Sequence, residues 1–258
     1  MAKTTEGNRA TKSVGSDYWS QSRRPLASLL FAGPLLVIYE TGLIFLGSNA
    51  QRNGADAWLR EHLKLLGFRD SFDYFLLPVL TVGILLGWHY ISRQPWRVSR
   101  RVLCGMVVEC LGLAISLWFS WRLYRFFLHA VAQTVGLNVA TKSLSDKLGT
   151  INSYFGAGIY EELLFRMIAL NLSVGLLAWL RVGRRASLAS GIVLTSVLFS
   201  AAHYIGPFGD KFEWLTFCFR FLAGAFFAVL FIYRGFGIAA GTHALYDVLV
   251  HLSISSVA

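Results

Sequence analysis

Residues 159–168 read IYEELLFRMI and place two adjacent glutamates and an arginine inside an otherwise apolar stretch. The stretch belongs to a weakly charged block that runs from about Leu148 to Leu180. That block exceeds the roughly 20 residues that a helix needs to cross a bilayer. Ionisable groups inside such a helix cost free energy unless they are paired or hydrated, and they are functional candidates by default. The stretch therefore predicts a membrane helix whose buried charges have a specific purpose.

The composition of the whole chain supports a membrane protein. Of the 258 residues, 55% are hydrophobic and 15% are charged, whereas a soluble domain carries about 25% charged residues. The net charge of +10 does not indicate nucleic-acid binding, because the basic residues form short clusters between apolar blocks. The three cysteines, Cys104, Cys110 and Cys218, lie within apolar blocks and match neither a disulfide framework nor a metal motif. The expected fold is an all-α, polytopic transmembrane helix bundle.

The apolar blocks predict about seven spans, with a range of six to eight. Between the first two spans, Ala55 to Leu66 has apolar residues at helical spacing, which predicts one short interfacial amphipathic helix. Gly156 and Gly158 lie in the fourth block and are positions where its helix can bend. The predicted spans are Leu26–Leu46, Phe75–Ile91, Val102–Ala132, Leu148–Leu180, Ser187–Tyr204, Phe212–Tyr233 and Gly237–Ile254.

Charge placement predicts the topology. Residues 1–24 are polar and basic, and we expect them to form a cytoplasmic tail. Residues 25–258 show no internal repeat or second domain and are expected to form a single transmembrane domain. Lysine and arginine are more frequent on the side of the N-terminus than in the alternate connecting segments. This bias predicts an integral, multi-pass membrane protein with a cytoplasmic N-terminus.

Within the fourth span, helical spacing separates the two glutamates. Glu162 and Arg166 are four residues apart, so they share a helix face and can pair. Glu161 is rotated by about 100° from Glu162 and has no cation on its own helix face. A carboxylate in this position is suited to general-base work. The alternative is a structural role, in which the ion pair fixes helix packing.

Two further motifs place histidines inside or at the ends of spans. Phe199 and His203 are four residues apart at the end of the fifth span. His243, Asp247 and His251 follow at intervals of four along the last span. A histidine and a carboxylate on adjacent turns can fix an imidazole tautomer or bind a metal together. The alternative for these residues is a polar contact between helices, worth about 1 kcal/mol.

Three motifs thus follow one another on separate predicted helices: E-E-x-x-x-R at Glu161, Glu162 and Arg166, F-x-x-x-H at Phe199 and His203, and H-x-x-x-D at His243 and Asp247. Together they resemble the CPBP family of intramembrane proteases. This family contains CAAX proteases and bacteriocin-processing proteases, and its eukaryotic, Rce1-like member is the type II CAAX prenyl endopeptidase. The resemblance covers roughly residues 145–255, the predicted catalytic core. The first half of the chain matches only in being transmembrane.

The resemblance implies roles for individual residues. Glu161 would be the general base, and His203 would orient the attacking water or donate a proton. His243 and Asp247 would face the tetrahedral intermediate. Glu162 and Arg166, with Phe199, would support the site.

Asp247 departs from the best-described eukaryotic-type members, which have asparagine there. Asparagine can donate a hydrogen bond to an oxyanion, whereas an ionised aspartate only accepts. We therefore expect Asp247 to orient His243 from behind. The alternatives are a protonated Asp247 and a metal ligand.

The same side chains raise the question of a metal. Zinc accepts oxygen and nitrogen donors of the kind offered by Glu161, His203, His243 and Asp247. A zinc site usually has two close ligands in one motif, such as H-E-x-x-H, and this chain lacks that motif. A mechanism without a cofactor is favoured, and a divalent metal such as zinc remains the alternative.

The resemblance therefore predicts an intramembrane endopeptidase. Its partners would be the lipid bilayer and a membrane-associated peptide or protein, with prenylated, leader-peptide and sorting-signal substrates all open, and no nucleic acid. One alternative is a catalytically inactive membrane scaffold or regulator. The other is an ion-coupled transporter, for which the sequence lacks the expected repeats. Glu40, Glu109 and His251 also lie in apolar blocks, and the sequence assigns them no role.

Overall fold

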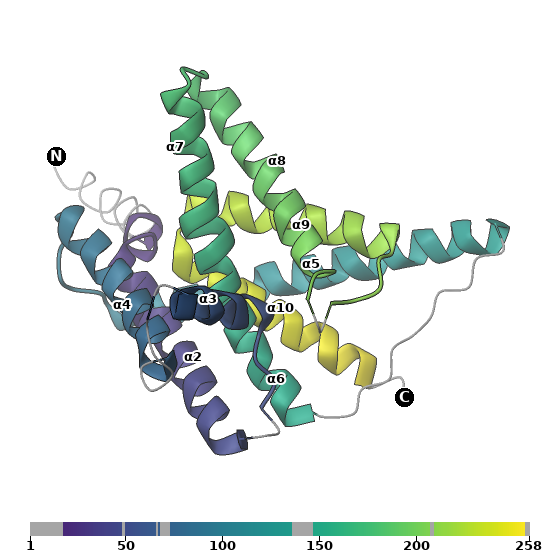
Figure 1. The fold of residues 1–258 in the computed structure, drawn as a ribbon, viewed down its shortest axis with the longest axis horizontal. Helices are drawn as coiled ribbons and strands as arrows, with labels where there is room; N and C mark the ends of the chain where they lie inside the picture. Colours follow the sequence, from purple (N-terminus) through teal and green to yellow (C-terminus); the bar gives the residue numbers. More distant parts are fainter. Residues whose placement is uncertain are drawn as a thin grey trace, which may run out of the picture.

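The structure is a computed structural model that describes residues 18–47, 50–65, 67, 73–135, 147–206 and 209–255. Helices dominate these residues, and the described part of the chain contains no β-strand (Figure 1). Most of the predicted basic tail lies outside the described residues. The helices are α2 (Pro25–Leu46), α3 (Gly54–Leu65), α4 (Asp73–Ile91), α5 (Arg100–Val135), α6 (Lys147–Gly156), η2 (Ala157–Leu170), α7 (Asn171–Trp179), α8 (Arg184–Ala202), α9 (Trp214–Arg234) and α10 (Phe236–Ser255).

Each predicted span corresponds to a helix or a continuous series of helices. In the described part of the chain, five are long and apolar enough to cross a membrane: Pro25–Leu46, Arg100–Phe127, Gly149–Trp179, Arg184–Ala202 and Trp214–Arg234. The apolar part of α4 is shorter, and α10 carries the polar H-x-x-x-D motif. The polytopic helical bundle is therefore confirmed, and the count of seven spans stays a prediction.

α10 runs through the middle of the bundle (Figure 1) and contacts α2, α5, α6, α9 and η2. Its first half is completely buried, from Phe236 to Ala244. Small residues fill that half, including Ala239, Ala240 and Gly241, and small residues allow helix backbones in a membrane to approach closely. The position of α10 brings His243 to the centre of the protein.

The segment with the two glutamates is π-helical. α6 ends at Gly156, η2 covers Ala157–Leu170, and α7 continues without interruption. The change from α- to π-helical geometry falls at these glycines, and a bend there stays a prediction. Gly158 allows η2 to approach α10, because a Cβ at this position would lie 2.5 Å from the carbonyl oxygen of Ala240. π-helical segments are rare and occur frequently at functional sites.

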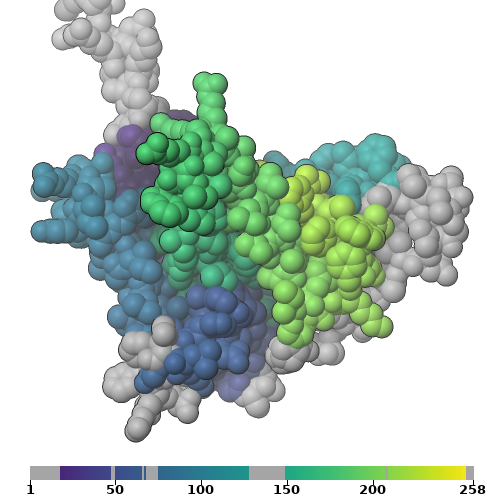
Figure 2. Space-filling model, turned by 45° about the horizontal axis from the view of Figure 1, so that its top comes forward, coloured from purple at the N-terminus to yellow at the C-terminus, as the bar shows by residue number. Residues whose placement is uncertain are grey.

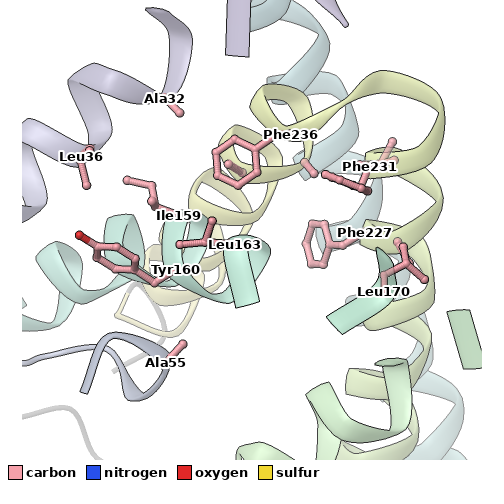
Figure 3. Close-up of a cluster of buried hydrophobic side chains, with 14 of the residues drawn as sticks. Ala32, Leu36, Ala55, Ile159, Tyr160, Leu163, Leu170, Phe227, Phe231 and Phe236 are labelled. Carbon is pink, nitrogen blue, oxygen red and sulfur yellow. The ribbon is translucent and has the colours of Figure 1, made fainter. Parts of the chain in front are cut away.

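Buried apolar residues join η2 to its neighbours (Figure 3). Ile159 and Tyr160 of η2 lie toward α2 and α3, and Leu163 lies toward the middle of the cluster. On the other side, Phe227 of α9 belongs to the same cluster. These contacts fix η2 on both sides, and they thereby determine where its glutamates lie.

The predicted amphipathic helix is present as α3, but its buried face differs from the expectation. Trp58 and Leu65, two of the apolar residues at helical spacing in this segment, are exposed, whereas Asp56 and Arg60 are buried. α3 packs on η2 and α4, and Figure 2 shows it in blue beside the green part of the chain. The reason for the difference is a polar network below α3, that is, on its buried side, formed by Glu40, Asp56 and Arg60. Arg60 forms ion pairs with Glu40 at 2.9 Å and with Asp56.

Candidate active site

The three motifs meet at one carboxylate oxygen. Oε2 of Glu161 lies 4.0 Å from Nε2 of His203 and 3.8 Å from Nε2 of His243. η2 carries the glutamate, the end of α8 carries His203, and α10 carries His243. Oε2 is buried and has no hydrogen-bond partner among the described residues. Two imidazole nitrogens and one carboxylate oxygen therefore converge on a common point in the interior of the bundle.

The end of α8 orients His203. The helix ends at Ala202, and His203 is its C-terminal cap. Nδ1 of His203 lies 2.8 Å from the carbonyl oxygen of Phe199. Since a carbonyl only accepts, Nδ1 carries the hydrogen and Nε2 of the neutral ring presents a lone pair to Glu161. The spacing of four residues in F-x-x-x-H is what places that carbonyl within reach.

Glu162 orients His243. Nδ1 of His243 lies 2.8 Å from Oε1 of Glu162, and a carboxylate at this distance accepts the Nδ1 hydrogen. Nε2 is then directed toward Glu161. The ring of Phe227 also stacks on His243, with centroids 4.4 Å apart and planes 16° apart. The imidazole is thus held at one nitrogen and along one face.

The expectation that Asp247 orients His243 from behind is wrong. Oδ2 of Asp247 lies 3.6 Å from Nε2 of His243, beyond hydrogen-bond distance and on the side that faces Glu161. Asp247 follows His243 by one helical turn, and its side chain is 22% exposed. Glu162 reaches the opposite nitrogen because η2 packs closely on α10. The tertiary contact with Glu162 therefore provides the partner that the sequence predicted within the last helix.

Glu162 also forms the predicted ion pair with Arg166. Nε of Arg166 lies 3.2 Å from Oε2 of Glu162, and both side chains are buried. The guanidinium donates to the carbonyl oxygen of Gly224 at 3.3 Å. Its central carbon lies 4.4 Å from the ring centroid of Phe199, which permits a cation–π contact. Phe199 in turn packs edge-on against His203, with centroids 4.9 Å apart.

Two residues of the site carry no signal in the sequence. Asn53 precedes α3, and its Nδ2 donates to Oε1 of Glu161 at 2.8 Å. Phe227 is one of many aromatic residues in the apolar blocks. Asn53 is 108 positions away from Glu161 in the chain, so no local pattern connects them. Only the packing of α3 on η2 reveals the contact.

The three ionisable residues without an assigned role lie in other contacts. Glu40 belongs to the network below α3 and accepts hydrogen bonds from Arg60 and Tyr160. Glu109 accepts from Arg234 at 2.7 Å, which joins α5 to the end of α9. His251 lies 3.1 Å from the hydroxyl oxygen of Tyr154. His251 therefore lies apart from the site that contains His243 and Asp247, although the three residues follow one another at intervals of four on α10.

Within the described ranges, no group of three or more His, Cys, Asp or Glu side chains is arranged so that it could hold a metal ion. Glu161, His203, His243 and Asp247 nevertheless offer donors of the type that zinc accepts. The question of a metal is therefore open to experiment.

Comparisons with known proteins agree with the motifs. Residues 144–249 match the family described as type II CAAX prenyl endopeptidase, Rce1-like. Neither the curated proteins nor the solved structures include a match to the chain. The matched range contains all three motifs, and the five apolar helices together with this match support an integral membrane protein. Residues 144–249, the part of the chain that carries the candidate site, are thus similar to the Rce1-like type II CAAX prenyl endopeptidase family.

Proposed function

We propose that the protein is an intramembrane endopeptidase that hydrolyses a peptide bond of a membrane-associated protein or peptide, in CAAX-type processing or a related reaction. The family match supports the reaction class. The observation that carries the proposal is the convergence of His203 and His243 on Oε2 of Glu161, which has no hydrogen-bond partner in the part of the chain that the structure describes. A carboxylate with an open acceptor beside an imidazole is the arrangement that water activation requires.

In the proposed first step, a water molecule enters between Glu161 and His203. Oε2 of Glu161 accepts one of its protons, while the Nε2 lone pair of His203 accepts a hydrogen bond from the other. The resulting hydroxide attacks the carbonyl carbon of the scissile peptide bond. Glu161 then returns the proton to the leaving amine nitrogen, so that the bond breaks and the carboxylate is restored.

The proposed role of His243 is to stabilise the oxyanion of the tetrahedral intermediate. Its Nδ1 hydrogen is already donated to Glu162. As a cation, the ring carries a second hydrogen on Nε2, which faces the same point as Oε2 of Glu161. A donor placed at the developing negative charge lowers the barrier of acyl transfer. Asp247, as an ionised carboxylate near Nε2, would hold the positive charge of the ring and would not donate to the oxyanion.

The remaining proposals concern the setting of the site. Residues 145–255 would form the catalytic core of a single transmembrane domain, 25–258, and Glu162, Arg166 and Phe199 would support its reactive residues. The distribution of lysine and arginine supports a cytoplasmic N-terminus. The bilayer and a membrane-associated substrate, prenylated substrates included, would be the partners.

Replacing His203 by alanine tests the proposed function. We expect the variant to lose at least about 100-fold in cleavage rate, because water activation loses its second acceptor. The measurement is cleavage of a panel of membrane-anchored fluorogenic peptides, one with a prenylated C-terminal CAAX sequence, by the purified protein in proteoliposomes. Thermal unfolding in detergent is the control for folding. A folded variant that cleaves at the wild-type rate would contradict the proposal.

Metal removal tests the choice between the two mechanisms. We propose a mechanism without a metal, so treatment with EDTA or 1,10-phenanthroline is expected to change the cleavage rate by less than about twofold. The control is a zinc peptidase assayed under the same conditions, which must lose its activity. Loss of cleavage that added zinc restores would show that the metal alternative is correct.

A further inference from the structure

The connection between α2 and α3 supplies a residue that contacts the proposed general base. Nδ2 of Asn53 donates to Oε1 of Glu161 at 2.8 Å. The other oxygen, Oε2, faces both histidines. We propose that Asn53 is a positioning residue of the site, which fixes the Glu161 carboxylate so that Oε2 remains open for water. This inference rests on the proposed function, since it assigns the role of Asn53 within that reaction.

Two further contacts hold Asn53 in place. Its Oδ1 accepts a hydrogen bond from the backbone N–H of Ala55 at 2.9 Å, which caps the start of α3. Its backbone N–H donates to the hydroxyl of Tyr39 at 3.1 Å. Because a backbone N–H only donates, the oxygen of the amide faces Ala55 and the nitrogen faces Glu161. The orientation of the side chain therefore follows from its own contacts.

The network below α3 anchors Asn53 to the rest of the protein. Tyr39, which accepts from Asn53, donates its own hydroxyl to Asp56 at 2.8 Å. The buried Arg60 pairs with Asp56 and with Glu40. Glu40 also accepts a hydrogen bond from Tyr160, the residue before Glu161. The α2–α3 corner thus binds two consecutive residues of η2, and this assigns a structural purpose to Glu40.

A neutral amide suits this position on chemical grounds. A cation at Oε1 would neutralise the carboxylate and weaken it as a base. An amide N–H fixes one oxygen without adding a charge. Precise placement of the reacting groups matters, because a displacement of about 1 Å can cost about 100-fold in rate. The loss of the Asn53 donor is therefore expected to lower kcat rather than raise KM.

The test is the replacement of Asn53 by aspartate. Asparagine and aspartate are about equally good as helix caps, so Asn53→Asp keeps the acceptor for Ala55, removes the donor to Glu161 and places a second carboxylate beside it. We expect kcat to fall by at least about 100-fold, with KM within about twofold and with the thermal unfolding temperature retained. If Asn53 only caps α3, Asn53→Asp cleaves like the wild type, and that result would overturn the inference.

Gln51 offers a matched control on the same connection. Gln51 is exposed, and its Oε1 accepts from Thr150 at 3.2 Å. Gln51→Glu makes the same change from amide to carboxylate, and we expect cleavage within about twofold of the wild type. An equal loss in Gln51→Glu would show a general effect of negative charge and would overturn the inference.

Two additional variants keep the outcome decisive. Asn53→Ser, assayed in parallel, keeps a capping oxygen on a side chain too short to reach Glu161 and adds no charge; the same criteria apply to it, and a wild-type rate in Asn53→Ser would overturn the inference even if Asn53→Asp is slow. Glu161→Gln, assayed in parallel, distinguishes a failure of the positioning role from a failure of the proposed mechanism. An active Glu161→Gln would overturn Glu161 as the general base, whereas a wild-type protein that cleaves none of the peptides would overturn the proposed function itself. An inactive Glu161→Gln beside a fully active Asn53→Asp would overturn the positioning role alone.

Discussion

Glutamine at position 161 is expected to lower the cleavage rate by about 100- to 10,000-fold, the contribution of a well-placed general acid–base group. The substitution keeps the size of the side chain and its oxygen acceptor for Asn53. It removes the proton acceptor that faces His203 and His243. The measurement is the rate of peptide cleavage in proteoliposomes, together with thermal unfolding of the variant in detergent.

Glu213 provides the control for this prediction. It is exposed and precedes α9, so Glu213→Gln removes a carboxylate without touching the site and should cleave like the wild type. A folded Glu161→Gln that retains wild-type activity would rule out the general base. An unfolded Glu161→Gln would favour the alternative in which these polar residues only pack helices.

The second large effect concerns stability. Arg166→Met removes the cation beside Glu162, while both positions remain buried. Removal of one partner of a buried ion pair typically costs about 3–5 kcal/mol, because an uncompensated charge is left in the interior. We therefore expect a marked fall in the unfolding temperature. The measurement is thermal or denaturant unfolding in detergent.

The double variant Arg166→Met with Glu162→Gln isolates the cause. Without the carboxylate, no buried charge remains at this position, and the glutamine oxygen can still accept from Nδ1 of His243. We expect the double variant to regain most of the lost stability, which a double-mutant cycle would detect as a coupling between the two residues. Equal losses in the single and double variants would show that Arg166 acts through packing on Phe199 instead.

Contacts within one helix were predictable from spacing. The pair of Glu162 and Arg166 lies four residues apart and is present. Nδ1 of His203 likewise reaches the carbonyl of Phe199, four residues earlier in the chain. Both contacts depend on helix geometry, which is nearly independent of the surrounding fold. The same reasoning failed for Asp247, because a partner four residues away on the same helix competes with partners on neighbouring helices.

Contacts between helices were only partly predictable. The order of the motifs indicated that Glu161, His203 and His243 belong together, but not which atoms face one another. The structure places Glu162 behind His243 and Asp247 on the side of Glu161. The close approach of η2 to α10 at Gly158 makes this arrangement accessible. A glycine in a sequence can indicate a bend or a close contact, and at Gly158 the packing shows a close contact.

The sequence by itself determined the helical membrane fold, the positions of the helices and the identity of the motif residues. These features follow from apolar block length and from residue spacing, which are local properties of the chain. Only the tertiary structure decided which carboxylate orients His243, which face of α3 is buried, and that Asn53 reaches Glu161. Those contacts join residues far apart in the chain, and they depend on how closely the helices pack.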